Sequence, residues 1–288
     1  MFKSILAVLF ASLLISSASS QDFLGLEATT YSEATAQKFW NLCMSSYCRT
    51  SRIAVWNLGF VSDLYKGVTD ITVVLNSTGD VCGFTAYYPV ENQIMFVFRG
   101  TKGLDFKNWM SNLDFLSIDY PGCSGCKVHG GFYKAYLQIQ QGMISSGKRL
   151  VEKYPNAKKI VTGHSLGGAL AVHASLDIVK NFGPIDEFYT FGQPRVGNEN
   201  FANYVNVLVP GNFHSRLTNN RDPVPHLPLI NMGFFHIDRE VHYENGSFKI
   251  CGLGEDKTCA NSHLDLNILD HLSYMGKNLI PYFITCNL

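Results

Sequence analysis

The feature that most limits the possible folds is the pentapeptide Gly163-His-Ser-Leu-Gly167, which fits the pattern G-x-S-x-G. A β-rich run, 159–162, directly precedes it, and a helix-compatible run of small residues, 166–180, directly follows it. This context predicts a sharp turn from strand to helix with Ser165 at the turn. Glycines two residues before and two after the serine let neighbouring backbone approach without a clash against a Cβ atom. Such a turn would expose the Ser165 hydroxyl beside a helix N-terminus, so we interpret Ser165 as a nucleophile rather than part of an ordinary glycine-rich turn.

The rest of the chain alternates between β-rich and helix-compatible segments. Strands are predicted at 70–75, 81–88, 94–98, 188–191 and 213–217, and helices at 33–47, 131–154 and 199–207. Strands that alternate with helices predict parallel strands joined by helical crossovers. With no internal repeat or linker, the sequence predicts one α/β domain over residues 21–288.

The N-terminus has the pattern of a secretory signal peptide. Lys3 is followed by the apolar run 5–15 and by small residues that end at Ser20. Ala18 and Ser20 fit the −3 and −1 positions of a cleavage site, so residues 1–20 are predicted to be removed. The run is shorter than the roughly 20 residues that a transmembrane helix needs.

Charge and composition exclude several classes of protein. The chain has 23 basic and 23 acidic residues, so no excess positive charge points to a nucleic-acid partner. Its 288 residues are 46% hydrophobic, which suits a large core and excludes disordered, coiled-coil and collagen-like chains.

Eight cysteines in an exported chain predict four disulfides. Cys123 and Cys126 form the only C-x-x-C pattern, and a zinc site there would need His129 and a fourth ligand that no second pair supplies. Cys251 and Cys259 enclose a short polar loop, whereas spacing alone cannot pair Cys43, Cys48, Cys82 and Cys286. Asn76 and Asn245 begin glycosylation sequons, which matter only if the protein is secreted.

A serine nucleophile needs an acid that orients its base. The α/β order of such sites is Ser, then Asp or Glu, then His. Asp177 falls within the helix after the serine, Asp186 precedes a strand, and Asp238 is a further candidate. Asp222 follows the predicted strand 213–217 in a tight polar loop, at the edge where these sheets hold their sites.

Nine histidines compete for the role of base. Those before Asp222 are in the wrong order, namely His129, His164, His173 and His214, and His226 is too close to the acid. His236 and His242 have an even spacing in a predicted strand, which is typical of a half-exposed strand. Of the remaining two, residue order favours His271 over His263.

Six motifs in order give a resemblance to a known family: Phe98-Arg-Gly-Thr101, Val128-His-Gly-Gly-Phe132, Gly163-His-Ser-Leu-Gly-Gly168, Phe191-Gly-Gln-Pro-Arg195, Asp222-Pro-Val-Pro225 and Asp270-His271. The sequence resembles the secreted fungal-type triacylglycerol lipases and feruloyl esterases, called class 3 lipases, from about Tyr31 to Cys286. The resemblance implies an α/β-hydrolase domain with a mostly parallel central sheet. It also implies a Ser165, Asp222 and His271 triad, and an oxyanion hole formed by Thr101 and Leu166.

Family members carry a lid after the Phe-Arg-Gly strand, which here would include Leu104, Phe106 and Trp109. Polar residues between these three make the apolar face imperfect, so a plain surface helix is an alternative to a gate. The resemblance also implies the disulfides Cys123–Cys126, Cys251–Cys259 and Cys48–Cys286, which leaves Cys43–Cys82.

These observations predict a secreted or lumenal serine hydrolase of carboxylic esters, with acylglycerols as the favoured substrate class. It would need no metal or organic cofactor, and its partners would be an ester substrate and, transiently, a lipid–water interface. An sn-1 phospholipase and a feruloyl-type esterase are alternatives of the same class. A catalytically silent lipid- or glycan-binding protein on the same fold is an alternative of another class.

Overall fold

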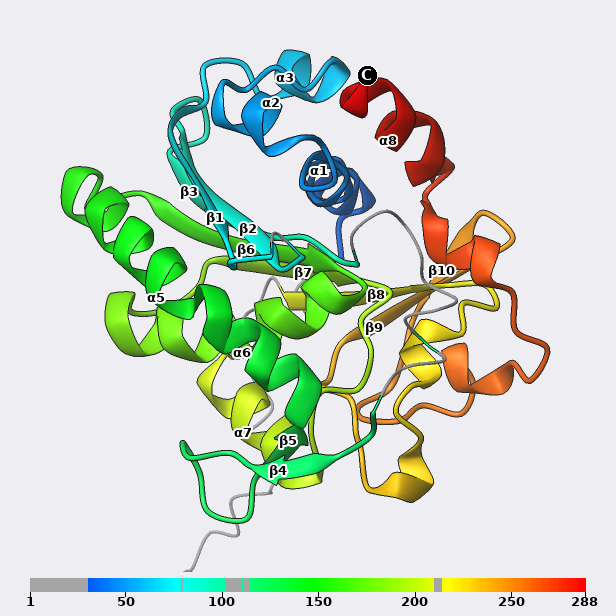
Figure 1. Ribbon diagram of the computed structural model, residues 1–288. Coiled ribbons are helices and arrows are strands. Elements are labelled where there is room, and N and C mark those ends of the chain that lie inside the picture. Colours follow the sequence, from blue (N-terminus) through cyan, green and yellow to red (C-terminus); the bar gives the residue numbers. More distant parts are fainter. Residues whose placement is uncertain (1–30, 79, 102–109, 111–113, 210–213) are drawn as a thin grey trace, which may run out of the picture.

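An eight-stranded sheet forms the centre of the molecule (Figure 1). The structure is a computed structural model, and it describes residues 31–78, 80–101, 110, 114–209 and 214–288. The strands lie in the order β1-β2-β3-β6-β7-β8-β9-β10. Their bounds are β1 Thr69–Leu75, β2 Cys82–Tyr88, β3 Gln93–Phe98, β6 Lys158–His164, β7 Glu187–Phe191, β8 His214–Asn219, β9 Glu240–Glu244 and β10 Ser247–Ile250.

The sheet is parallel in its middle and antiparallel at both edges. Neighbours from β3 to β9 pair in parallel, whereas β1, β2 and β3 form antiparallel pairs and β10 pairs antiparallel with β9. The predicted parallel strands are therefore confirmed from β3 to β9, where helical crossovers join the strands as far as β8. Two small sheets accompany it, one of β4 (Ser117–Asp119) with β5 (Lys127–His129) and one of β11 (Ser273–Tyr274) with β12 (Lys277–Asn278).

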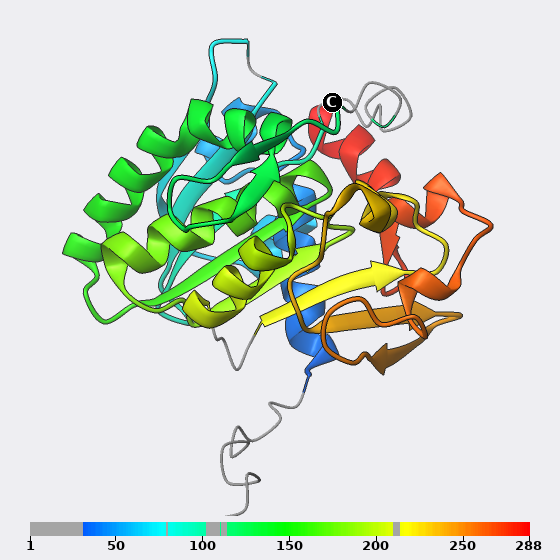
Figure 2. The same ribbon diagram turned by 90° about the horizontal axis from the view of Figure 1, so that it is seen from below.

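Helices cover both faces of the sheet (Figures 1 and 2). One face carries α5 (Gly130–Lys153), α6 (Leu166–Phe182) and α7 (Glu199–Leu208). The other carries α1 (Glu33–Ser45), α2 (Thr50–Ala54), α3 (Phe60–Leu64) and the C-terminal α8 (Leu279–Asn287). Four short 3₁₀ helices lie among the described residues of the C-terminal half: η3 Val224–His226, η4 Ile230–Met232, η5 Ala260–Ser262 and η6 Ile268–Leu272.

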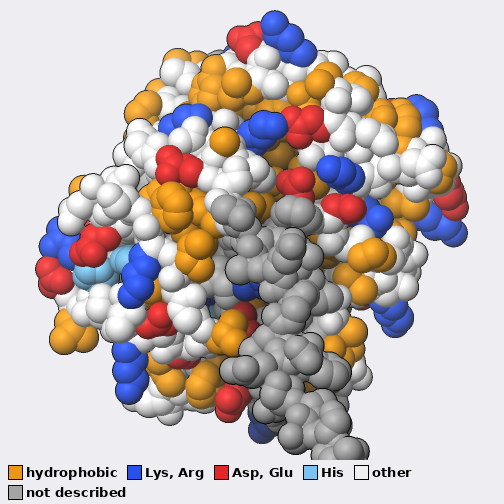
Figure 3. All heavy atoms as spheres, turned by 180° about the vertical axis from the view of Figure 1, so that it is seen from behind, with side chains coloured by type: hydrophobic (Ala, Val, Ile, Leu, Met, Phe, Trp, Pro, Cys, Tyr) orange, Lys and Arg blue, Asp and Glu red, His pale blue; other side chains and the backbone are white. Residues whose placement is uncertain are grey.

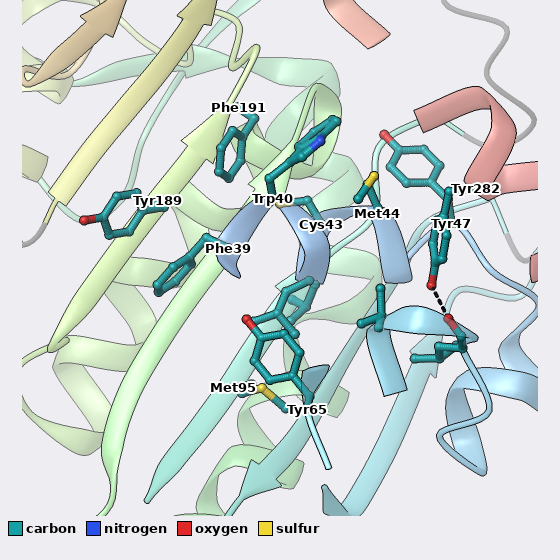
Figure 4. Close-up of a cluster of buried hydrophobic side chains, with 14 of the residues drawn as sticks. Phe39, Trp40, Cys43, Met44, Tyr47, Tyr65, Met95, Tyr189, Phe191 and Tyr282 are labelled. Atoms are coloured by element: carbon teal, nitrogen blue, oxygen red, sulfur yellow. Dashed lines mark hydrogen bonds between the residues drawn. The ribbon is translucent and has the colours of Figure 1, made fainter. Parts of the chain in front are cut away.

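Each face has its own hydrophobic core. The core under α1 joins that helix to the sheet through aromatic contacts, such as Phe39 stacked on Tyr189 with ring centroids 4.5 Å apart (Figure 4). Trp40 is fully buried between Phe191 and Tyr274, so α1 packs directly behind the segments that carry the candidate site. The apolar residues of β6 alternate between the two cores, with Ile160 in one and Val161 in the other, as expected for a strand buried on both faces.

Three disulfides are present among the described residues, and they are the pairs Cys48–Cys286, Cys123–Cys126 and Cys251–Cys259. The first joins the turn that follows α1 to α8 and so fixes the C-terminal helix near the start of the fold. The fourth predicted pair, Cys43–Cys82, is wrong, because both cysteines are free and buried. Cys43 contacts Thr162 of β6, with Sγ and Oγ1 3.0 Å apart, and β2 lies two strands away from β6, roughly 10 Å.

Two smaller expectations concern a pair of histidines and the two sequons. His236 and His242 do not share a strand, because β9 begins only at Glu240. The turn between β9 and β10 exposes the sequon residue Asn245, whereas Asn76 is half-buried and its side-chain amide donates to Gln138 at 2.7 Å.

Candidate active site

Ser165 occupies the turn between β6 and α6. Its φ of 59° and ψ of −129° lie in a region that non-glycine residues rarely adopt. The Ser165 N–H donates to the Phe191 carbonyl of β7 at 2.9 Å, while the Ser165 carbonyl accepts from the Gly168 N–H at 2.9 Å. The strained turn is thus held by the next strand on one side and by the first turn of α6 on the other.

The two glycines of the pentapeptide are required by close contacts. A Cβ atom on Gly163 would lie 2.1 Å from the Gly167 carbonyl oxygen, and one on Gly167 would lie 2.2 Å from the Phe98 carbonyl oxygen. Backbone cannot move away there without displacing β3 or α6. The sequence argument for these glycines therefore holds: β3, β6 and α6 approach one another too closely for a side chain.

Asp222 and His271 form a buried hydrogen-bonded pair. His271 Nδ1 lies 2.8 Å from Asp222 Oδ2, and the two side chains are 0% and 1% exposed. Because an ionised carboxylate can only accept, in the neutral imidazole the proton lies on Nδ1 and Nε2 carries the lone pair. The pair therefore has the arrangement of a base whose tautomer is fixed by an acid.

Neighbouring groups hold the Asp222 carboxylate. Its Oδ1 accepts from the Val224 N–H at 2.8 Å, and its Oδ2 also accepts from the Tyr274 hydroxyl at 3.1 Å. Burial, followed by the Asp222 charge, raises the pKa of Tyr274 well above its ordinary value, so this hydroxyl stays a donor. The Asn219 side chain donates to the Asp270 and Ser273 carbonyls at 3.0 and 2.8 Å, which fixes the backbone on both sides of His271.

One backbone segment brings the serine and the pair together. The Phe191 carbonyl accepts from Ser165, and a Cβ atom on the next residue, Gly192, would lie 2.7 Å from His271 Nδ1 and 2.9 Å from Asp222 Oδ2. His164, directly before Ser165, stacks near His271 with ring centroids 4.4 Å apart. The structure therefore gathers Ser165, Asp222 and His271 at the carboxyl ends of β6, β7 and β8.

His164 supports this arrangement rather than acting as a base. Its Nε2 lies 2.9 Å from the His271 carbonyl oxygen, and its Nδ1 lies 2.7 Å from the Tyr47 hydroxyl. A carbonyl only accepts, so His164 donates from Nε2 and accepts at Nδ1 from Tyr47. Burial lowers the pKa of His164 well below its ordinary value, so the ring is neutral. Sequence reasoning placed this side chain away from the nucleophile but did not foresee that it holds the His271 backbone.

The expected oxyanion donors flank Ser165. Gly100 packs against the turn, since a Cβ atom there would lie 3.2 Å from Ser165 Cβ and 2.1 Å from the Tyr47 hydroxyl. Thr101 follows Gly100 directly, and its buried hydroxyl has no hydrogen-bond partner among the described residues. Leu166 is the first residue of α6, where N–H groups have no partner within the helix. The expected lid residues Leu104, Phe106 and Trp109 lie outside the described residues, as does the predicted signal peptide, 1–20.

The other sequence candidates lie elsewhere. Asp177 accepts from Tyr136 and from Gln140, both at 2.6 Å, on the side of α6 that faces α5. Asp186 accepts from the Lys159 N–H before β7, and Asp238 accepts from the side chain of Asn206. The competing histidine, His263, lies next to His242 rather than next to Asp222.

Comparison with known proteins decides the family. A family model for lipase (class 3) matches residues 95–232. A lipase of Rhizomucor miehei is 39% identical over 197 residues, which cover 65% of this chain and 53% of that protein. The solved structure of lipase II from Rhizopus niveus superposes with a TM-score of 0.78 and 32% identity, covering 86% of this chain and 97% of that one. The chain belongs to the class 3 lipase family.

This membership confirms the α/β-hydrolase fold that the sequence motifs implied. A further solved structure, described as a serine protease triad that forms the catalytic centre of a triacylglycerol lipase, is 34% identical. It matches with a TM-score of 0.75 over 85% of this chain and 95% of that one. The chain spans about half the length of the curated lipases that it matches first. Among the described residues, no helix of this family member is long and apolar enough to cross a membrane.

Proposed function

We propose that this protein is a serine hydrolase of carboxylic esters, with acylglycerols as its substrates. The observation that carries the proposal is the gathering of a strained serine turn and a buried His271–Asp222 pair at one edge of the sheet. Membership of the class 3 lipase family supports the same chemistry. A silent binding protein would have no need of a histidine tautomer fixed by a buried carboxylate.

The proposed reaction uses each of these groups in turn. Ser165 Oγ attacks the ester carbonyl while its proton passes to His271 Nε2, and Asp222 stabilises the resulting imidazolium. The imidazolium then donates that proton to the departing alcohol, which leaves an acyl group on Ser165. Water, deprotonated by the same nitrogen, attacks the acyl-enzyme and releases the carboxylic acid.

Thr101 and Leu166 are the proposed oxyanion donors. The Leu166 N–H lies at the start of α6, where the helix dipole also favours negative charge. Thr101 is the residue after Gly100, which packs against Ser165, and it offers both a hydroxyl and an N–H. Donors of this kind act on the charge that develops in the transition state and contribute roughly 3 kcal/mol each.

We also propose that the protein acts outside the cell or in a lumenal compartment. The signal-peptide pattern of residues 1–20 supports export, and the three disulfides suit an oxidising compartment. On the face that Figure 3 shows, acidic and basic side chains are interspersed, which agrees with their equal numbers in the sequence.

Two assays test this proposal. Turnover of p-nitrophenyl butyrate by the parent protein would support an ester hydrolase, and its absence would favour a binding protein. Rates on emulsified triolein, phosphatidylcholine and methyl ferulate then separate the ester classes. We expect triolein to be hydrolysed fastest; a preference for methyl ferulate or phosphatidylcholine would overturn the acylglycerol assignment while leaving the mechanism intact.

A further inference from the structure

A second group of histidine and carboxylate side chains lies away from Ser165, on the last strands of the sheet. His242 and Glu244 are two residues apart on β9, so their side chains share one face of the sheet. His263 follows η5 and approaches the same face. One potential ligand atom from each of these residues lies within 4.8 Å of those of the other two.

The hydrogen bonds of His242 determine which of its nitrogens is free to bind. The Thr218 hydroxyl donates to Glu240 Oε1 at 2.7 Å, so its oxygen accepts the proton of His242 Nδ1 at 2.9 Å. His242 Nε2 is therefore unprotonated and directs its lone pair towards His263 Nε2. Metal-binding histidines almost always donate their other ring N–H to a fixed acceptor, and the Thr218 hydroxyl fills that role here.

The spacing of the two imidazoles fits one metal ion. His242 Nε2 and His263 Nε2 are 3.3 Å apart. Two nitrogens that bind one zinc ion at the tetrahedral angle are about 3.3–3.4 Å apart. Glu244 Oε1 lies 3.7 Å from His263 Nε2 and within 4.8 Å of the ligand atom of His242, and its exposed side chain is able to turn towards both imidazoles. Two histidines and one carboxylate with an open fourth position make a common zinc ligand set.

The loop that carries His263 is held in place independently of these contacts. The disulfide Cys251–Cys259 closes the loop, and buried Arg195 binds both Glu255 and Asn261 within it. The Ala260 N–H donates to Glu240 Oε1, which also accepts from Thr218. The loop and β9 thus share one buried carboxylate, so His242 and His263 are already positioned before any ion binds.

The nearby ammonium group of Lys249 does not prevent a metal ion from binding. Lys249 of β10 pairs with His242 across the strands, but its ammonium group is bound by the Thr258 hydroxyl and carbonyl. Glu240 beside the cluster and Glu244 within it supply two negative charges, and Arg216 offsets the first of them.

We propose that His242, Glu244 and His263 bind one Zn²⁺ ion, with water as the fourth ligand. The ion would join the loop 251–263 to β9 and so stabilise the segment that leads to His271, about 8 residues further along. Zinc at this place stabilises the fold and takes no part in ester hydrolysis.

The test compares zinc binding by the full, untagged protein and by variants at the exposed end of the cluster. Isothermal titration with ZnCl₂ should give one site per chain, and the melting temperature should rise with zinc but not with MgCl₂. His263→Gln and Glu244→Gln should each weaken binding at least tenfold and remove most of the zinc-dependent rise. Glu152→Gln is the matched control, because Glu152 is exposed and lies on α5, outside the cluster.

Cobalt gives a spectroscopic measurement that does not depend on stability. Co²⁺ bound to the parent protein should show the intense visible bands of four-coordinate geometry, and His263→Gln should lose them. The proposal is overturned if the parent binds neither ion, or if His263→Gln and Glu244→Gln bind zinc as the control does. In that case the two imidazoles are joined only by a hydrogen bond.

Discussion

The serine and its base are held in place by two different kinds of structure. The turn at Ser165 is fixed by backbone, with β3, β6 and α6 packed so closely that only glycine fits at Gly163 and Gly167. The His271 segment is a short 3₁₀ helix fixed by side chains, above all those of Asn219, Asp222 and His164. The comparison shows that a rigid core can present the nucleophile, whereas the base depends on individual polar contacts that single substitutions remove.

The largest effect should come from a substitution in the rigid turn at Ser165. Ser165→Ala removes the nucleophile, and such a loss reduces the rate about a million-fold. Because the turn is held by backbone contacts, the melting temperature should change little. Hydrolysis of p-nitrophenyl butyrate measures the first quantity and calorimetry the second. More than a few per cent residual activity, with contamination excluded, would remove Ser165 from the mechanism.

The next largest effect should come from the polar contacts that hold His271. Asp222→Asn keeps the shape of the side chain but lets its amide donate to His271, which favours the wrong imidazole tautomer. The rate should fall roughly ten-thousand-fold, as in the serine-protease template. Circular dichroism should show an unchanged fold. If kcat falls less than tenfold, the buried carboxylate does not orient the base.

Acid should lower the stability of the fold through α6, the helix that follows Ser165. His173 on α6 is fully buried, neither ring nitrogen has a partner among the described residues, and burial lowers its pKa to about 3. An unfolded histidine titrates near about 6.5, so below that pH the unfolded chain binds a proton that the folded one does not. Stability is therefore complete above pH ~6.5 and falls as the pH decreases towards ~3.

His173→Phe removes this contribution and keeps the ring packed against Tyr136 and Phe201. When the pH is lowered from 6.5 to 4.5, the free energy of unfolding should decrease in both proteins. The decrease should be about 2–3 kcal/mol smaller in the variant than in the parent. Urea unfolding at the two pH values measures the difference. Equal losses in the two proteins would show that His173 is not the group that titrates.

An effect far smaller than that of Ser165→Ala concerns the proposed oxyanion hole beside Ser165. Thr101→Val removes the hydroxyl but keeps the N–H and the shape, so kcat should fall roughly a hundred-fold with little change in KM. Thr101→Ser retains the hydroxyl and should stay within a few-fold of the parent. If the two variants behave alike, the hydroxyl does not bind the oxyanion.

The two regions also differ in how far the sequence predicts them. The turn at Ser165 is local: five residues and their flanks determine it, so the pattern was sufficient. Asp222 and His271 are 49 residues apart, and only their order in the chain and the family motifs selected them. No sequence pattern predicts the contacts that hold them, which come from Asn219, Tyr274 and His164. These contacts depend on where three strands end relative to one another.

Cysteines and histidines far from the pentapeptide were harder to place. The pair Cys43–Cys82 failed because a count of cysteines carries no information on strand order. His242 was interpreted as part of a half-exposed strand, yet it is buried and meets His263 across a loop closed by a disulfide. Such contacts arise only when the loop folds back on β9.

Covalent labelling tests the central claim most directly. An alkyl p-nitrophenyl phosphonate mimics the tetrahedral intermediate and reacts only with a serine that is activated by a base. The account predicts one label per chain, located by mass spectrometry on the peptide that contains Ser165, with esterase activity lost in proportion to labelling. Asp222→Asn should label far more slowly, and Ser165→Ala not at all. Full activity in the labelled protein, or a label on another residue, would contradict it.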